Sequence, residues 1–239
     1  MTEMKKPNSE RRRVLLFAEK GEALAAEVEK QAEALGWDLR LVRPQAGSNF
    51  TASTALESLS AEVAGAAEAM GGLDAAIAIP RRPSWAAFAN ESHQSFEESL
   101  DLGVLLPLAF LQAAAREMAQ AGSGGRLIVV ADGTAMRGLP GAALRSATQG
   151  ALLAAMRSLA QEYAAGGITA NCVVEGWTET TPGRGPDQPE QNKLLRYIPM
   201  KRFGTAADSV GVLRYLVSAE SAFMTGQVIA VDGGLLKHL

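Results

Sequence analysis

The sequence contains few of the residues that bind metals or form disulfides. Its 239 residues include one cysteine, Cys172, and two histidines, His93 and His238. A single cysteine excludes an internal disulfide framework, and two histidines argue against a histidine-based metal cluster. We therefore predict no metal centre. We expect Cys172 to be an inert residue inside a buried strand.

The sequence also lacks a strong positive charge and long apolar runs. A net charge of -3 argues against nucleic-acid binding, because a phosphate-binding surface needs an excess of Lys and Arg over a broad face. The basic run Arg11–Arg13 is local, and we interpret it as a solubilising part of a polar tail, residues 1–13. No apolar stretch reaches the roughly 18 residues of a membrane span. We predict no nucleic-acid or membrane partner and a cytoplasmic location.

From residue 14 onward, short apolar runs alternate with helical segments. We predict buried strands at residues 14–18, 39–42, 73–79, 126–130, 169–174 and 228–231. We predict helices at residues 22–35, 56–70, 96–120, 142–165 and 207–218. Apolar strands that alternate with helices are typical of a parallel sheet covered on both faces. The pattern predicts one α/β domain, residues 14–239, with a doubly wound, Rossmann-type parallel sheet.

Several segments of the chain resemble those of a known enzyme family. The ending TGQVIAVDGG, residues 225–234, has the form of a last strand and its turn. Upstream lie GGRLIVVAD at residues 124–132, SLAQEYAAGGITANCVVEGWTET at 158–180 and IPMKRFGTAAD at 198–208. Together these segments resemble the short-chain dehydrogenase/reductase family, a single-domain Rossmann fold. The resemblance covers essentially everything from Leu73 onward, and the start more weakly.

This resemblance implies four catalytic positions, and the chain has replaced the family residue at each. In the family a tyrosine exchanges the carbonyl proton, a lysine four residues later lowers its pKa, a serine thirteen residues earlier orients the substrate, and an asparagine completes a water relay. These positions fall on Arg145, Gln149, Asp132 and Asp101. Arginine keeps its proton at physiological pH, and a carboxylate at Asp132 opposes the negative charge that develops on a carbonyl oxygen. We therefore predict that the chain has no catalytic residues.

The turn that binds the cofactor in the family is also degenerate. Where the family has TGxxxGxG, this chain has AEKGEALA, residues 18–25, with Gly21 alone. Glu19 and Glu22 lie where the helix N-terminus would otherwise attract phosphate, so they would repel a dinucleotide. The family's NNAG falls on AIPR, residues 78–81, and the segment between residues 43 and 73 is one strand and helix too short. We predict a missing edge unit and no NAD(P) bound by this chain.

Asp132 and Arg145 occupy positions that face each other across the family's active site. We predict that they form an ion pair that fills the cleft, in preference to either residue binding a ligand. If the pair is buried, removal of one partner would cost on the order of 3 kcal/mol.

The segments that stay closest to the family pattern are those that form its oligomer surfaces. They are the helices at 142–165 and 207–218 and the last strand, residues 226–231. Our first hypothesis is a non-catalytic subunit of a hetero-oligomer, whose active paralogous subunit binds NAD(P) and acts on a hydroxyacyl or ketoacyl substrate. The chain resembles the inactive subunit type of one such assembly in the family, a hydroxyacyl-CoA dehydrogenase of anaerobic toluene degradation.

Two other hypotheses remain open at this point. One is a homo-oligomeric regulatory protein that senses a small molecule in the vestigial cleft. The other is an atypical enzyme, for example a lyase or isomerase, that uses Asp101 or Asp132 as a base.

Overall fold

The computed structural model describes residues 11–43, 52–180 and 195–238. The strands are β1 (Arg12–Phe17), β2 (Trp37–Val42), β3 (Ala75–Ala78), β4 (Gly125–Asp132), β5 (Ile168–Glu175) and β6 (Val228–Val231). The helices are α1 (Ala23–Leu35), α2 (Ala52–Ala69), α3 (His93–Leu100), α4 (Leu106–Ala121), α5 (Ala143–Tyr163) and α7 (Ala206–Val217). A π-helical turn, Asp101–Leu105, joins α3 to α4.

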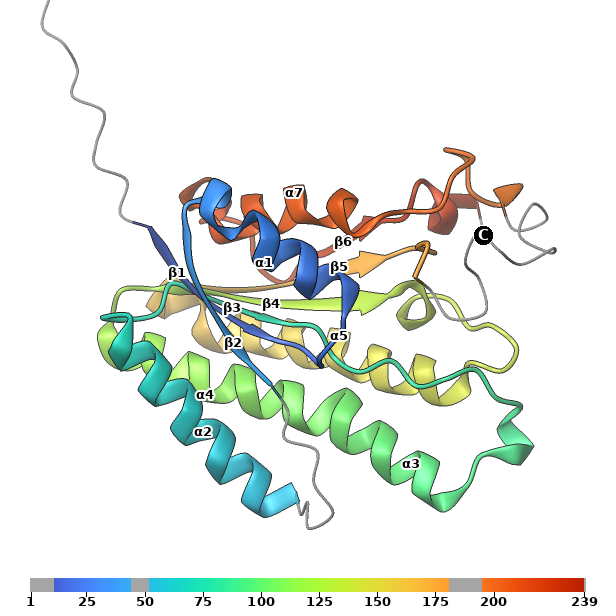
Figure 1. Ribbon diagram of the computed structural model, residues 1–239, viewed down its shortest axis with the longest axis horizontal. Coiled ribbons are helices and arrows are strands. Elements are labelled where there is room, and N and C mark those ends of the chain that lie inside the picture. Colours follow the sequence, from blue (N-terminus) through green and yellow to red (C-terminus); the bar gives the residue numbers. More distant parts are fainter. Residues whose placement is uncertain (1–10, 44–51, 181–194, 239) are drawn as a thin grey trace, which may run out of the picture.

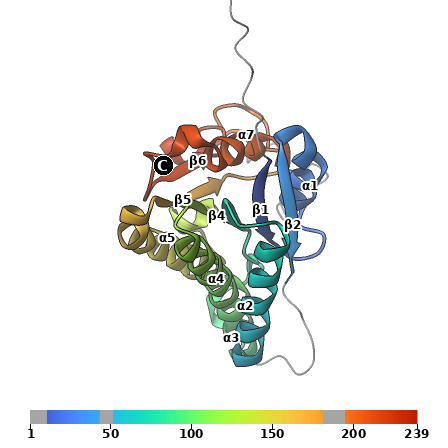
Figure 2. The ribbon, with the colours of Figure 1, turned by 90° about the vertical axis from the view of Figure 1, so that its left-hand side faces the viewer.

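Within the described residues, six strands form one sheet in the order β2-β1-β3-β4-β5-β6, and every neighbouring pair is parallel. Helices α1 and α7 cover one face, and α2, α4 and α5 cover the other (Figure 1). The view turned by 90° shows the sheet between these two layers (Figure 2). The predicted doubly wound parallel sheet is confirmed, and β2 is the edge strand on its side of the described sheet, as the short segment between residues 43 and 73 predicted.

The apolar runs form continuous strands because both faces of the sheet are buried. In β1, Leu15 and Phe17 point into the core under α2, α4 and α5, whereas Val14 and Leu16 point into the core under α1 and α7. The ring of Phe17 stacks on that of Phe110 in α4, with 5.3 Å between the ring centroids. Packing into one core or the other holds each helix on one face of the sheet. That face decides from which side the helix reaches the carboxyl ends of the strands.

The first strand begins two residues earlier than predicted, so Arg12 and Arg13 do not belong to a polar tail. Arg13 donates from Nη2 and Nε to the carboxylate of Asp74, at 2.7 and 3.0 Å. The backbone N–H of Arg12 donates to the carbonyl of Gly36 at 2.9 Å. These contacts hold the first residues of β1 against neighbouring segments. The residues of a solvated tail would have no such partners.

One helical run in the described part of the chain, His93–Ala121, is long and apolar enough to cross a membrane by length and composition. No such stretch was expected from the sequence. Eight residues of α4, within this run, are buried in the core, among them Phe110 and Leu111. We therefore interpret its α4 part as a core helix, because these buried residues pack against the sheet rather than facing a membrane or solvent.

The topology brings several strand ends to one edge of the sheet. The chain passes from β1 outward to β2 and then returns to β3 on the other side of β1. In open α/β sheets, ligand crevices form outside the carboxyl ends of the strands at such a reversal. Two of the neighbouring strands end on acidic residues, β4 on Asp132 and β5 on Glu175, and these two residues are register partners.

A substitution at Gly176, the residue after β5, tests how closely the ends of β5 and β6 approach each other. A Cβ atom at Gly176 would lie 2.7 Å from the Cα of Asp232, whereas one at Gly211, an exposed position inside α7, would have no atom within 4 Å. We expect Gly176→Ala to lower the free energy of unfolding by about 1–3 kcal/mol through this backbone clash. Gly211→Ala should raise it by up to about 1 kcal/mol. Urea unfolding would check both; equal effects would contradict the close approach.

Candidate functional site

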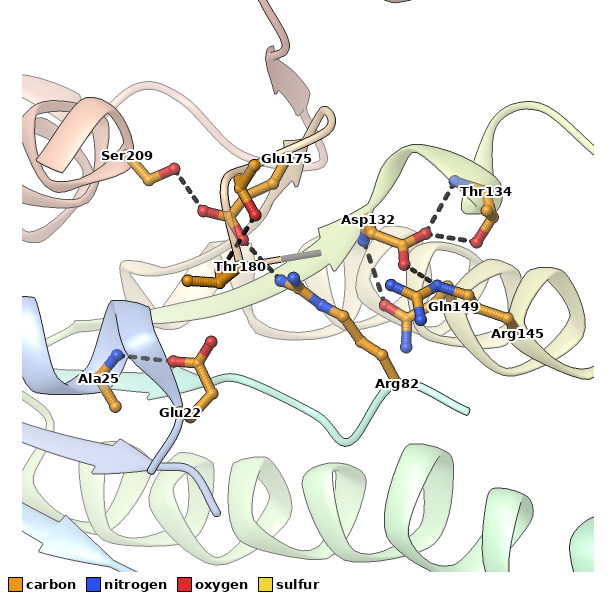
Figure 3. Close-up of polar contacts among 11 residues, drawn as sticks. Glu22, Ala25, Arg82, Asp132, Thr134, Arg145, Gln149, Glu175, Thr180 and Ser209 are labelled. Atoms are coloured by element: carbon orange, nitrogen blue, oxygen red, sulfur yellow. Dashed lines mark hydrogen bonds and ion pairs between the residues drawn. The ribbon is translucent and has the colours of Figure 1, made fainter. Parts of the chain in front are cut away.

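The predicted ion pair between Asp132 and Arg145 is confirmed. Asp132 ends β4, and Arg145 lies in the first turn of α5. The Nε of Arg145 donates to Oδ2 of Asp132, and the two side chains are 3% and 7% exposed for Arg145 and Asp132 respectively (Figure 3). The pair therefore occupies two positions at which the resemblance expects serine and tyrosine.

Further contacts hold both charges of this pair. Oδ1 of Asp132 accepts from the backbone N–H of Thr134 at 2.8 Å and also from its hydroxyl. Nη1 of Arg145 donates to the carbonyl of Pro83 at 2.9 Å, and its Cζ lies 5.5 Å from the ring centroid of Trp85. A buried ion pair needs such additional hydrogen bonds to offset its desolvation. The cavity beside it, lined by Trp85, Leu139, Trp177 and Leu235 among others, has a volume of about 20 Å³, enough for about one water molecule.

Of the other two predicted positions, one joins this cluster and one does not. Gln149, fully buried in α5, accepts from the backbone N–H of Asp132 through Oε1 at 3.2 Å. Its Nε2 has no hydrogen-bond partner among the described residues. Asp101 begins the π-helical turn and makes no side-chain hydrogen bond or ion pair with another described residue. The structure therefore assembles three of the four predicted positions.

A second buried ion pair lies next to the first, and the sequence analysis did not predict it. Nη2 of Arg82 donates to Oε2 of Glu175 at 2.6 Å, and the hydroxyl of Ser209 in α7 donates to Oε1 at 2.6 Å (Figure 3). The Glu175 side chain is 3% exposed and that of Arg82 is 19% exposed. The available signal was a charged residue immediately after each of two apolar runs, Arg81 and Arg82 after one and Glu175 at the end of the other.

The charges of the crevice change the pKa values of its members. Burial alone would lower the pKa of the Arg82 guanidinium, but the carboxylates of Glu175 and then Asp132 raise it above its usual value. Burial raises the pKa of the Glu22 carboxyl, and the nearby charge of Arg82 offsets this only in part. Among the described residues, the carboxylates of Asp132, Glu175 and Glu22 face the guanidinium groups of Arg82 and Arg145, so these five side chains have no net positive charge to offer a pyrophosphate.

The turn after β1 places acidic side chains at the N-terminus of α1. The carboxylate of Glu22 accepts from the backbone N–H of Ala25 at 2.6 Å and so caps the helix. Gly21 has a φ of 85°, in the left-handed region. Oε1 of Glu19 lies 3.8 Å from Nε of Arg81, and both side chains are about half exposed. A backbone donor that could otherwise receive an anion is therefore already bound to Glu22.

The structure also places the single cysteine. Cys172 lies inside β5, and burial raises the pKa of its thiol to about 12. A protonated thiol is neither a good nucleophile nor a good metal ligand, which agrees with the inert role predicted for it. The described residues hold no group of three or more His, Cys, Asp or Glu side chains placed to bind a metal ion.

Comparison with known proteins places these features in a family context. A family model described as enoyl-(acyl carrier protein) reductase matches residues 10–236. The 3-oxoacyl-[acyl-carrier-protein] reductase MabA of Mycobacterium avium is 33% identical over 144 residues, which are 60% of this chain and 56% of that protein. The chain thus spans about half the length of the curated relatives it matches.

Solved structures match over more of the chain. The TT0495 protein of Thermus thermophilus is 25% identical, with a TM-score of 0.81 over 95% of this chain and 99% of that one. A short-chain dehydrogenase of Leptospira borgpetersenii with bound NAD+ has a TM-score of 0.81 at 16% identity, over 95% of this chain and 93% of that one. The second likeness shows a shared fold alone.

The buried pair gives a first test of the site. Asp132→Ala would leave the Arg145 charge buried without its counter-ion, and we expect a loss of about 3 kcal/mol in the free energy of unfolding. Lys30→Ala, which breaks the exposed Lys30–Glu27 pair, should have little effect. Chemical denaturation of both variants would check this. Similar effects from the two substitutions would show that Asp132 and Arg145 are not a buried pair.

The raised pKa of Glu22 predicts that the stability of the folded chain depends on pH. A carboxyl whose pKa is higher in the folded state binds its proton more tightly there, so its contribution to stability is lost as the pH rises past its ordinary value. The free energy of unfolding of wild type relative to Glu22→Gln should therefore fall as the pH rises above about 4.

Glu27 provides a control of opposite sign. Hydrogen bonds from Gln31 and Lys30 lower the pKa of its carboxyl. Wild type should therefore gain stability relative to Glu27→Gln as the pH rises toward about 4, the ordinary pKa of a glutamate, and this difference should stay constant above it. Unfolding curves at several pH values would separate the two, and a trend of the same sign in both variants would contradict the burial argument for Glu22.

Proposed function

The chain belongs to the short-chain dehydrogenase/reductase family, and on that premise we propose that it is a non-catalytic subunit that assembles with an active member of the family. One observation carries the proposal: the buried pair of Asp132 and Arg145 at the positions of the family's serine and tyrosine. Arg145 holds its proton at physiological pH and has no acidic hydrogen to give to a carbonyl oxygen. Gln149, at the lysine position, brings no charge that could lower the pKa of a neighbouring group.

We further propose that this chain binds no NAD(P) and that the active partner does. The capping of α1 by Glu22 supports this, because the N–H of Ala25 already has an anionic acceptor. The pair of Arg82 and Glu175 supports it too, because it crosses the crevice between the segment after β3 and the end of β5. A dinucleotide at this edge would need both sets of contacts to rearrange.

For the assembly we propose an acyl substrate, which is bound in the active site of the partner subunit. MabA, a relative of this chain, is named as a reductase of 3-oxoacyl groups on acyl carrier protein. A hydroxyacyl or ketoacyl thioester is therefore the substrate class we propose. The finer form of the proposal is the inactive subunit of a dehydrogenase acting on 2-[hydroxy(phenyl)methyl]succinyl-CoA.

The surfaces proposed to contact the partner are helices α5 and α7 and strand β6. β6 is the other edge of the described sheet, so one side of its backbone is open to further pairing. Phe223, just before β6, is fully exposed, and Tyr215 in α7 is 41% exposed. Large exposed apolar side chains beside an open strand edge favour association with another chain.

The two alternative functions have weaker support. A homo-oligomeric sensor of a small molecule is favoured by a cavity of about 250 Å³ between Glu22, Arg81 and Thr178, although this volume is below that of most ligand pockets. An atypical enzyme with Asp132 as its base conflicts with the contacts of that carboxylate to Arg145 and Thr134. Asp101 remains outside the cluster.

Calorimetric titration of the purified chain tests the cofactor part of the proposal. We expect no binding of NAD+, NADH, NADP+ or NADPH to the chain alone, because its crevice carries its own ion pairs. Binding of any of them would contradict our interpretation of Glu22 and Gln149 and would reopen catalysis. Co-expression with an active paralogue that has the tyrosine and lysine, followed by mass measurement in solution, should give a mixed oligomer.

A pair of substitutions tests the proposed contact surface. Phe223→Asp should abolish the mixed oligomer, because it places a charge on an apolar contact, and it should leave the melting temperature of the isolated chain unchanged. Met136→Asp is the matched control: its side chain is also exposed, at 56%, but follows β4 at the opposite end of the strands. Loss of the oligomer in both variants, or in neither, would contradict this surface.

A further inference from the structure

Two arginine side chains divide the crevice into separate chambers. Arg82 and Arg145 each line three cavities: the one of about 20 Å³ beside Trp177, the one of about 250 Å³ beside Glu22, and one of about 210 Å³ against α3. Because Arg82 and Arg145 line all three cavities, we interpret each of them as a partition between neighbouring cavities. If one partition moved away, the chambers on its two sides would join.

The two partitions are held to different degrees. Arg145 is fixed by Asp132, by the carbonyl of Pro83 and by the ring of Trp85. For Arg82, the hydrogen bond from Nη2 goes to Glu175, while its buried Nε has no hydrogen-bond partner in the part of the chain that the structure describes. Arg82 is therefore the partition that depends most on a single contact.

The surroundings of the Arg82 guanidinium are organised around that contact. Ser209 donates to the other oxygen of Glu175 and so fixes the plane of the carboxylate. Figure 3 shows Arg82 extending toward Glu175 from the segment after β3, with Glu22 and Asp132 on either side of it. Three carboxylates thus face one planar cation, and the carboxylate that binds it directly is buried and already oriented.

We infer that Glu175, oriented by Ser209 and assisted by Glu22, forms a seat for a planar cation, and that Arg82 is the resident ligand that keeps the crevice closed. Guanidinium fits this seat because it is flat and carries directional N–H donors, one of which, Nη2 of Arg82, binds Glu175, whereas a spherical cation has no such direction. The inference rests on the proposed function and extends it, because it names the group that takes the place of an external ligand.

Emptying the seat and refilling it from solution tests this inference. Arg82→Ala leaves Glu175 buried without its counter-ion, so we expect the melting temperature to fall by about 6–15 °C. Millimolar guanidinium should raise the melting temperature of Arg82→Ala by about 3 °C relative to the same concentration of sodium, because it binds the vacated seat of the folded state. The matched control is Arg81→Ala, which removes the neighbouring, half-exposed arginine that faces Glu19.

Wild type and Arg81→Ala should show no such gain, since Arg82 fills the seat in both. An equal response to guanidinium in all three proteins, or no difference from sodium in Arg82→Ala, would overturn the inference. If Arg82→Ala does not fold, Arg82→Met is the alternative, because it keeps most of the side-chain volume and still removes the guanidinium group from Glu175.

A double variant separates the seat from a general effect of guanidinium. Arg82→Met with Glu175→Leu removes both charges, so its melting temperature should recover toward that of wild type. It should also lose the response to guanidinium, because the receptor carboxylate is gone. A response as large as that of Arg82→Met alone would overturn the assignment to Glu175.

The same proteins distinguish this inference from the proposed function. Rescue of Arg82→Ala by guanidinium, together with dinucleotide binding by wild type, would support the seat for a planar cation. It would contradict both the closure of the crevice by Arg82 and the proposal that this chain binds no NAD(P). No rescue, together with no dinucleotide binding by wild type, would contradict the seat and leave the proposed function supported.

Discussion

Two carboxylates buried side by side at the ends of neighbouring strands must each be neutralised. The register of β4 and β5 places Asp132 next to Glu175, so the backbone itself creates this requirement. An unpaired charge in such a place would cost several kcal/mol. Because the strands end there, the counter-charges come from other elements: Arg145 from α5 and Arg82 from the segment after β3.

The two ion pairs are parts of one network. Arg145 donates to the carbonyl of Pro83, the residue that follows Arg82, so the first pair holds the backbone from which the second pair starts. In a parallel α/β sheet this edge is the usual place for a ligand. Here the chain's own charges cross it and leave separate cavities of about 20, 250 and 210 Å³ beside them. A crevice closed in this way supports a role that does not require a bound dinucleotide.

The features predictable from the sequence were those set by local pattern or fixed spacing. Continuous apolar runs identified the strands, and the short segment before Leu73 predicted the missing edge unit. The pair of Asp132 and Arg145 followed from their thirteen-residue spacing in the family pattern. The pair of Arg82 and Glu175 did not, because the two residues are 93 positions apart and their contact depends on the path of the chain after β3.

Other features depended on tertiary partners that a pattern of single residues does not contain. Arg12 and Arg13 read as part of a polar tail because charged residues rarely begin a buried strand. The carboxylate of Asp74, 61 positions away, is what makes Arg13 part of the first strand. The π-helical turn at Asp101 had no signal in the helical periodicity, and the Asp101 side chain does not join the cluster that its family position suggested.

The ion-pair network also bears on the surfaces proposed to contact a partner. Arg145 belongs to α5 and Ser209 to α7, and both bind carboxylates at the carboxyl ends of the sheet. The network therefore ties two helices on opposite faces to adjacent strands at the same edge. In the proposed subunit, which would bind no dinucleotide, buried ion pairs with defined geometry can hold these elements in one arrangement, although apolar residues of similar volume would stabilise the fold as well. A subunit whose role is to present α5 and α7 to a partner would need that arrangement at all times, and charges supplied by its own chain provide it independently of any cofactor concentration.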